Sequence, residues 1–289
     1  MGQIVVTGAT GQLGGLVIRH LLSLGVEADN IKGIVRSADK GAALKELGVQ
    51  TVQADYDDPA SLVQAFAGAS KLLFVSGSTM DDIERIRQHA NVVEAARNAG
   101  VGHILYTSLA FAESIENGLA KVHLATEFMI RTTNIPFTFL RNAIYMEALV
   151  NESLQGNIAQ GELVTSAPTG LINYVTRNNL ALAAAVVLTQ EGHDNKTYEL
   201  VNPNPFSFDK FAALLSEVSG QPVKHRTAAP EDVVKSMIEA GVPEGMAGIT
   251  VYGVYAAIED GQFGRPSEDL VKLIGDKFTN IQTVIRQVL

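Results

Sequence analysis

Short apolar runs alternate with amphipathic stretches along the first half of the chain. Ile4–Val6 is β-branched and Lys71–Val75 is almost wholly apolar, as expected for strands covered on both faces. Between such runs, apolar residues recur at helical spacing, as with Val17 and Leu21. The expected strands are 4–6, 31–35, 49–54, 71–75, 103–106 and 136–140. This alternation predicts a parallel sheet with right-handed crossovers.

A glycine-rich turn joins the first expected strand to the first expected helix. Its glycines stand at Gly8, Gly11 and Gly14. Gly8 allows a sharp turn, Gly11 lets a diphosphate approach the backbone, and Gly14 lets the helix press against the strand. The N-terminus of that helix then faces the phosphates. The residues expected at the dinucleotide are Gly8, Thr10, Gly11, Gln12, Leu13 and Gly14.

In the second half of the chain, strands and helices no longer alternate regularly. Short strands are expected at 163–166 and 171–175, an alanine-rich helix at 178–189, and a strand at 196–201 that rejoins the sheet. We therefore expect an α/β protein with a doubly wound, Rossmann-like parallel sheet. The expected domains are an NAD(P)-binding domain at 1–150 and a smaller, mostly helical substrate-binding subdomain at 151–289, interleaved with the first.

Composition limits the classes of binding partner and the cellular compartment that we expect for the protein. The 289 residues carry a formal charge of −9, with no basic cluster, which argues against a nucleic-acid or anionic-membrane surface. The chain has no cysteine, which suits a reducing compartment. The longest apolar run, 180–188, is less than half of the ~20 residues that a spanning helix needs. A strand begins at once, which leaves no room for a signal peptide, so we expect a cytoplasmic protein.

Residues that follow the expected strands bear on the choice of cofactor. Arg36, with Lys40 nearby, stands where an NAD-specific site has an acid, so it favours the 2′-phosphate of NADPH unless it is a plain solvated arginine. Asp55 either touches the adenine or caps the next turn. Ser76–Ser78 either contact the ribose through hydroxyl and N–H groups or form an ordinary loop, and Thr107 is expected at the cofactor as well.

Three side chains are candidates for the acceptor site. Hydride transfer from a nicotinamide puts charge on the acceptor oxygen, so a nearby hydrogen-bond donor should speed it. The candidates are His123, Asn142 and Tyr145. Each has a purely structural alternative. His123 would then be a half-buried imidazole on a helix, Asn142 a loop amide with its hydrogen bonds satisfied, and Tyr145 a ring packed in the core. The other histidines lack ligand spacing, so we expect no metal.

Several motifs together resemble one family. They are Thr7–Gly14, Ile34–Arg36, Gln53–Tyr56, Tyr106–Leu109, Leu140–Asn142, Tyr198–Leu200 and Leu273–Gly275. In this combination the chain resembles the NmrA-like atypical short-chain dehydrogenases, and within them the bacterial type 2 NAD(P)H:quinone oxidoreductases, with triphenylmethane dye reductases as relatives. The resemblance implies NADPH binding and hydride transfer to quinones without flavin. The family also contains members that bind the cofactor and act as regulators.

The chain departs from the usual short-chain dehydrogenase pattern at one place. Those enzymes carry Tyr-x-x-x-Lys on the helix after the fifth strand, where this chain has Leu119 and His123. Leucine cannot deliver a proton, so quinone-like acceptors are favoured over simple ketones. The alternative function is a non-catalytic NADP-binding redox sensor. A homodimer formed through exposed helices is possible.

Overall fold

The computed structural model describes residues 2–115 and 118–289 and divides the chain into two compact units. Unit one comprises the described residues up to Asn142, together with Arg177–Leu200 and Asp269–Lys277. Unit two comprises Ala143–Thr176, Val201–Glu268 and Phe278–Leu289. The chain therefore passes between the units several times. The sequence predicted two interleaved domains, at 1–150 and 151–289.

A parallel sheet forms the centre of unit one. Among the described residues it has seven strands in the order β3-β2-β1-β4-β5-β6-β10. The strands are β1 (Gln3–Val6), β2 (Ile31–Val35), β3 (Gln50–Gln53), β4 (Ala69–Phe74), β5 (Ile104–Leu109), β6 (Phe137–Asn142) and β10 (Lys196–Leu200). The strand order reverses between β1 and β4, which is where ligands bind in doubly wound sheets. The predicted fold class is confirmed.

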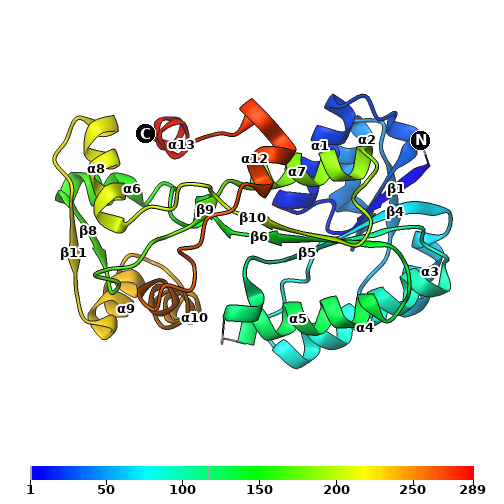
Figure 1. The fold of residues 1–289 in the computed structure, drawn as a ribbon, viewed down its shortest axis with the longest axis horizontal. Coiled ribbons are helices and arrows are strands. Elements are labelled where there is room, and N and C mark those ends of the chain that lie inside the picture. The colour runs from blue at the N-terminus through cyan, green and yellow to red at the C-terminus, as the bar shows by residue number, and fades with distance from the viewer. Residues whose placement is uncertain (1, 116–117) are drawn as a thin grey trace. The chain divides into compact units, whose positions relative to one another are not determined.

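Helices cover both faces of this sheet (Figure 1). α3 (Pro59–Phe66), α4 (Asp82–Asn98) and α5 (Gly118–Arg131) lie on one face. On the other face lie α1 (Gln12–Ser23), α2 (Ala42–Glu46) and α7 (Arg177–Thr189), with α12 (Asp269–Ile274) packed against α7. Residues 180–188 of α7 are all buried, because α7 is packed on several sides and its alanines allow close approach to α1.

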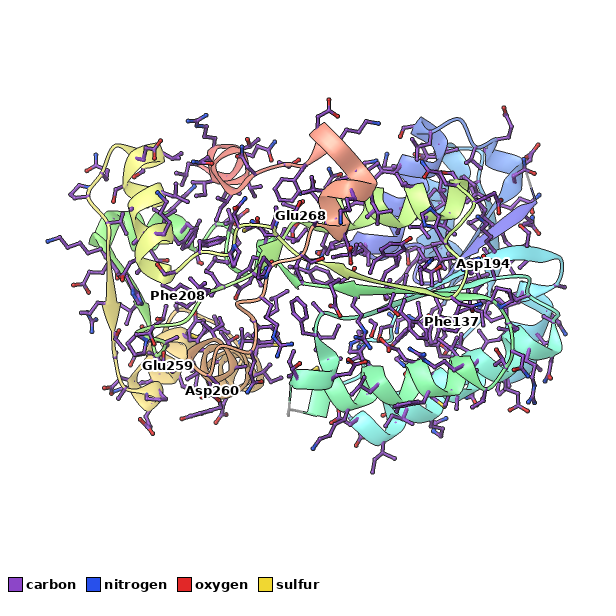
Figure 2. The ribbon with its side chains drawn as sticks, viewed as in Figure 1. Phe137, Asp194, Phe208, Glu259, Asp260 and Glu268 are labelled. Carbon is purple, nitrogen blue, oxygen red and sulfur yellow. The ribbon has the colours of Figure 1, made fainter. Side chains whose placement is uncertain are left out.

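The core between the sheet and α3–α5 is rich in aromatic rings. Phe66, Phe74, Tyr106 and Phe139 are fully buried. The rings of Phe74 and Tyr106 lie 5.0 Å apart, and those of Tyr106 and Phe139 meet edge to face at 6.5 Å. Side chains fill the layer on each face of the sheet (Figure 2). Burial of such rings is the main stabilising contribution here, because each removes a large apolar area from water.

Two expectations about individual elements need correction. The spacing of Ile83, Ile86, Val93 and Ala96 predicts that they lie on one side of a helix at 81–99. Ile83, however, is 82% exposed near the start of α4. The strands expected at 103–106 and 136–140 continue to Leu109 and Asn142. Ser108 and Arg141, each one residue before the end of its strand, are polar yet buried, because a carboxylate from another element satisfies them, as described below.

Unit two combines short strands with helices. β8 (Glu162–Thr165) pairs with β11 (Lys224–Thr227), and β7 (Ile144–Tyr145) pairs with β9 (Tyr174–Val175), both in parallel. The helices are α6 (Leu154–Gln160), α8 (Phe208–Ser219), α9 (Pro230–Glu239), α10 (Glu244–Gly248), α11 (Ala256–Glu259) and α13 (Ile281–Val288), with a π-helical segment at Ile249–Tyr255. In the described part of the chain, no helix has both the length and the apolar character that spanning a bilayer would take.

Candidate functional site

The turn between β1 and α1 presents free backbone donors. Gly8 adopts φ +58°, and the N–H of Gly11 donates to the Gly8 carbonyl at 2.9 Å. A Cβ on Gly14 would overlap that carbonyl, and one on Gly11 would lie only 3.1 Å from it. Among the described side chains, none caps α1, whose N-cap is Gly11. The N–H groups of its first turn therefore face outward at the positive end of the helix dipole, which is a favourable place for a phosphate.

The end of β2 lies beside this turn. Gly33 approaches it so closely that a Cβ there would be 3.0 Å from the Cβ of Ala9. Arg36 follows β2 with an exposed side chain, and within the described residues no carboxylate pairs with it. Its carbonyl accepts the Nε2–H of Gln53 at 3.1 Å. The guanidinium is thus free to meet an anion.

Tyr56 ties the ends of β1, β3 and β4 together. Its hydroxyl lies 2.6 Å from both the Thr7 hydroxyl and the Val75 carbonyl. Thr7 Oγ1 also accepts the N–H of Val75 at 2.9 Å. Asp55, just before Tyr56, accepts the N–H of Asp57 at 3.0 Å, so it caps the following turn, one of its two predicted roles. These bonds fix the strand ends around the switch point.

The loop after β4 is anchored through its main chain. The N–H of Ser76 donates to Thr107 Oγ1 at 2.9 Å, and the N–H of Gly77 donates to His89 Nε2 at 2.9 Å. Arg85 donates to the Ser76 hydroxyl at 2.7 Å. The two N–H groups that the sequence assigned to a ribose are therefore engaged within unit one. Ser78, the next candidate, is exposed.

His123 points into the protein from α5. Its Nδ1 lies 2.8 Å from the Tyr106 hydroxyl, and the imidazole is buried rather than half-buried. Burial lowers the pKa of His123 well below its ordinary value, with nearby Arg85 adding to the effect. Burial also raises the pKa of Tyr106 to about 12, so its hydroxyl keeps its proton. Leu119, the other position of the missing dyad, has its side chain outside the described part.

A buried arginine gathers carboxylates at the ends of β5, β6 and β10. Arg141 donates to both oxygens of Glu127, at 2.9 and 2.8 Å, and to Glu113 and Glu199 at 2.8 and 3.1 Å. Ser108 donates to Glu127 Oε1 at 2.7 Å. Arg141 and Glu127 are almost fully buried, so their charges are satisfied by each other rather than by water. The sequence did not predict this cluster.

Next to the cluster, two residues stand out. Phe111 has φ +53°, an unusual conformation for a residue with a side chain, and its N–H donates to Glu199 Oε2 at 2.8 Å. Burial raises the pKa of Glu199. Asn142 ends β6, and its Oδ1 is buried with no partner among the described residues. An orphaned buried acceptor at the ligand-binding edge of a sheet suits an amide N–H of a ligand.

The comparisons with known proteins agree with this architecture. The model of the NmrA-like family matches residues 1–282. The chain is 38% identical to quinone oxidoreductase 2 of Escherichia coli over 278 residues, which are 96% of each chain. A Citrobacter sp. triphenylmethane reductase complexed with NADP(H) is 54% identical, with a TM-score of 0.96 over 99% of this chain and 100% of that one. NADPH-dependent quinone oxidoreductase QOR2 from Escherichia coli, complexed with NADPH, is 36% identical, with a TM-score of 0.91 over 99% and 98% of the two chains.

The chain belongs to the NmrA-like family. In this NmrA-like protein, unit one holds the glycine turn, Arg36, the β4 loop, Thr107, His123 and Asn142. Tyr145 belongs to unit two, where it lies half-buried in β7 beside β9. The predicted acceptor-site residues are therefore not all gathered in one unit. The described residues contain no cluster of three or more His, Asp or Glu side chains that could hold a metal ion.

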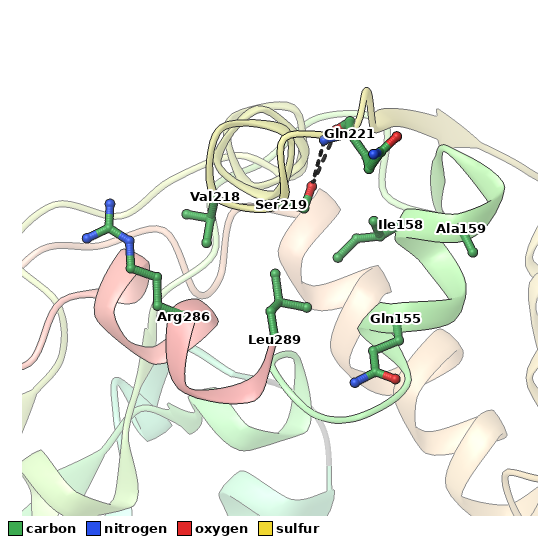
Figure 3. Close-up of a pocket in the computed structure, with 8 residues that line it drawn as sticks. All are labelled: Gln155, Ile158, Ala159, Val218, Ser219, Gln221, Arg286 and Leu289. Atoms are coloured by element: carbon green, nitrogen blue, oxygen red, sulfur yellow. Dashed lines mark hydrogen bonds between the residues drawn. The ribbon is translucent and has the colours of Figure 1, made fainter.

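Unit two has an open depression of about 580 Å³ (Figure 3). Ile158 of α6 and Leu289 at the end of the chain point into it, whereas Arg286 points away. The lining residues are Gln155, Ile158, Ala159, Val218, Ser219, Gln221, Arg286 and Leu289. None of them is buried, so the depression offers no preorganised polar group to a ligand.

Sequence reasoning missed His89, Thr126 and the Arg141 cluster. His89 and Thr126 are 37 residues apart, and Arg141 and Glu199 are 58 apart. Local spacing gives no sign of such pairs. The available signal was compositional: polar residues at the ends of otherwise apolar strands, such as Ser108 and Arg141, need buried partners.

Proposed function

We propose that the protein is an NADPH-dependent oxidoreductase that reduces quinones, or similar conjugated electrophiles, by direct hydride transfer without flavin. The observation that carries the proposal is the β1–α1 turn, whose Gly8–Gly14 contact leaves the first N–H groups of α1 free for a diphosphate. Relatives that are named as an NADPH-dependent quinone oxidoreductase and a triphenylmethane reductase with NADP(H) support it.

The residues of the turn fit a dinucleotide. Gly14 leaves no room for a Cβ and Gly11 leaves little, so the backbone itself forms the cradle, as a pyrophosphate requires. Thr10, Gly11 and Gln12 are exposed, so a ligand can reach them. Arg36 would pair with the 2′-phosphate that distinguishes NADPH from NADH, because a guanidinium matches phosphate geometry.

The nicotinamide ring of the bound cofactor would supply the hydride. In our proposal Asn142 would accept the carboxamide N–H of that ring through its unpartnered Oδ1. His123, with Nδ1 accepting the Tyr106 proton, would carry its own proton on Nε2 and act as a neutral donor.

The state of His123 bears on the choice of acceptor. Its strongly lowered pKa keeps the imidazole neutral near pH 7, so it is not a cationic acid. Reduction of a simple ketone leaves a strongly basic alkoxide, which calls for a stronger acid than a neutral imidazole. A quinone takes up one hydride and one proton to become a hydroquinone, and its oxyanion is a much weaker base. The site therefore favours quinones over ketones.

The test is the oxidation of NADPH by the purified protein with and without a benzoquinone, followed by the loss of the dihydronicotinamide absorbance. We expect turnover above the uncatalysed rate without added flavin. Binding of NADPH with turnover no faster than background would instead support an NADP-binding regulator. Absence of NADPH binding would contradict both.

We also propose that the protein acts in the cytoplasm as a homodimer. Ile83 on α4 and Phe128 on α5 are 82% and 67% exposed, and these two helices pack side by side. Large exposed apolar side chains on neighbouring helices favour association. Sedimentation equilibrium tests this, and Ile83→Glu should shift a dimer toward monomer.

A further inference from the structure

The loop after β4 is held by side chains from two other elements. Thr107 of β5 accepts the N–H of Ser76, and His89 of α4 accepts the N–H of Gly77. The backbone N–H groups of two successive residues thus donate to side chains of two different elements. The loop begins at the carboxyl end of β4, next to β1, where the strand order reverses. Its shape therefore sets one wall of the crevice in which a dinucleotide binds in such sheets.

The hydrogen bonds fix the tautomer of His89. Thr126 donates its hydroxyl proton to the Val122 carbonyl at 2.8 Å, so it can only accept from His89 Nδ1, at 2.8 Å. The N–H of Gly77 needs an acceptor, which Nε2 provides. Both bonds require the neutral imidazole with its proton on Nδ1. Nδ1 thus donates and Nε2 accepts, with the Ser76 hydroxyl also 3.4 Å from Nε2.

Packing holds the imidazole in place. His89 is fully buried, and its ring meets that of Phe74 at 5.0 Å and that of Tyr106 at 5.9 Å, both edge to face. Burial lowers the pKa of His89 to about 3, so the neutral form persists at physiological pH. Thr126, on α5, thereby connects a second helix to the loop.

We propose that His89 is a positioning residue for the cofactor: through Thr126 on one side and Gly77 on the other, it holds the β4 loop in the shape that NADPH binds. The inference rests on the proposed function. The residue acts through the loop backbone and does not contact the reacting atoms. Its loss should therefore weaken NADPH binding more than it slows hydride transfer.

Three variants separate this role from general packing. His89→Phe keeps the volume but leaves the Gly77 N–H without its acceptor. His89→Gln places an amide oxygen near the position of Nε2 and can restore that bond. Thr126→Val is nearly isosteric and removes the hydroxyl that accepts from His89 Nδ1, together with its own bond to the Val122 carbonyl.

We expect His89→Phe to raise the Kd and the KM for NADPH about tenfold, the effect of one lost buried hydrogen bond, with kcat for a benzoquinone within about twofold of wild type. His89→Gln should recover most of the affinity, and Thr126→Val should show a smaller rise. Melting temperatures measured in parallel establish that each variant is folded. Should His89→Phe fail to fold, Thr126→Val decides: a raised Kd supports the proposal and an unchanged Kd overturns it.

The proposal is overturned if a folded His89→Phe binds NADPH like wild type, or if His89→Gln binds as poorly as His89→Phe. Failure of the proposed function looks different, because the wild-type protein itself would then not bind NADPH.

Discussion

Two regions at the same edge of the sheet are shaped in different ways. The β1–α1 turn is shaped by backbone: Gly14 lies against the Gly8 carbonyl, and no described side chain caps the helix. The ends of β5 and β6 are shaped by side chains, with Arg141 bonded to Glu127, and Ser108 bonded to the same carboxylate. The first region leaves its polar groups free for a ligand, whereas the second satisfies nearly all of its own. The turn is thus an open binding surface. The cluster of Arg141, Glu127 and Ser108, which we call the support, is bonded internally.

The largest effect should come from breaking the support. Arg141→Met leaves Glu127 buried without its partner, and we expect the free energy of unfolding to fall by about 3–5 kcal/mol, measured by urea titration. Glu113→Gln is the matched control: Glu113 is 68% exposed, so its change should cost less than about 1 kcal/mol. Equal small losses in both variants would show that the cluster is not a support.

Next in size is a change within the turn. Gly14→Ala places a methyl group against the Gly8 carbonyl and should displace α1 from the turn. We expect the Kd for NADPH to rise about a hundredfold, or about 2.7 kcal/mol, near the upper end of the 1–3 kcal/mol typical of overpacking. Gly15→Ala is the control, because its Cβ would meet the Ala9 carbonyl at an ordinary 3.5 Å. If both alanine variants bind NADPH alike, the close contact does not shape the site.

Stability should also depend on pH through His89, which lies in neither region but holds the loop after β4. His89 has a pKa of about 3 in the folded protein against an ordinary 6.5, so between these values only the unfolded chain takes up the proton. Stability contributed by neutral His89 is therefore complete above pH 6.5 and is lost as the pH falls. Between pH 7 and 5 wild type should lose about 2 kcal/mol more than His89→Phe. Urea titrations at the two pH values measure this, and parallel losses would contradict it.

The smallest effect concerns one exposed side chain. Arg36→Ala should raise the Kd for NADPH about tenfold while leaving that for NADH nearly unchanged, because only NADPH carries the 2′-phosphate. Lys40→Ala, a second exposed cation nearby, is the control and should have less effect. Equal losses for the two cofactors in Arg36→Ala would refute its selective role.

The contrast between the regions also explains which structural features could be predicted from the sequence. The turn lies within seven residues, from Gly8 to Gly14, so its spacing alone predicted its place between strand and helix. Alternating apolar runs predicted the parallel sheet for the same reason. Local patterns contain the information for local structure.

The supporting side chains could not be found in this way. His89 depends on Thr126 and Gly77, and Arg141 depends on Glu199, all brought together only by the tertiary fold. Ile83 fitted the helical period but lies at the exposed start of α4, because periodicity does not say where a helix leaves the core. Such residues are positioned by partners that are distant in sequence.

The central claim is that the diphosphate of NADPH binds the free backbone N–H groups of α1. Amide chemical shifts of ¹⁵N-labelled protein, recorded during titration with NADPH, test it most directly. We predict that the amides of Gln12, Leu13 and Gly14 shift most and saturate together with the binding isotherm, and that the corresponding amides of Gly14→Ala shift far less at the same NADPH concentration. Saturable NADPH binding that leaves these amides unshifted in the wild-type protein would contradict it.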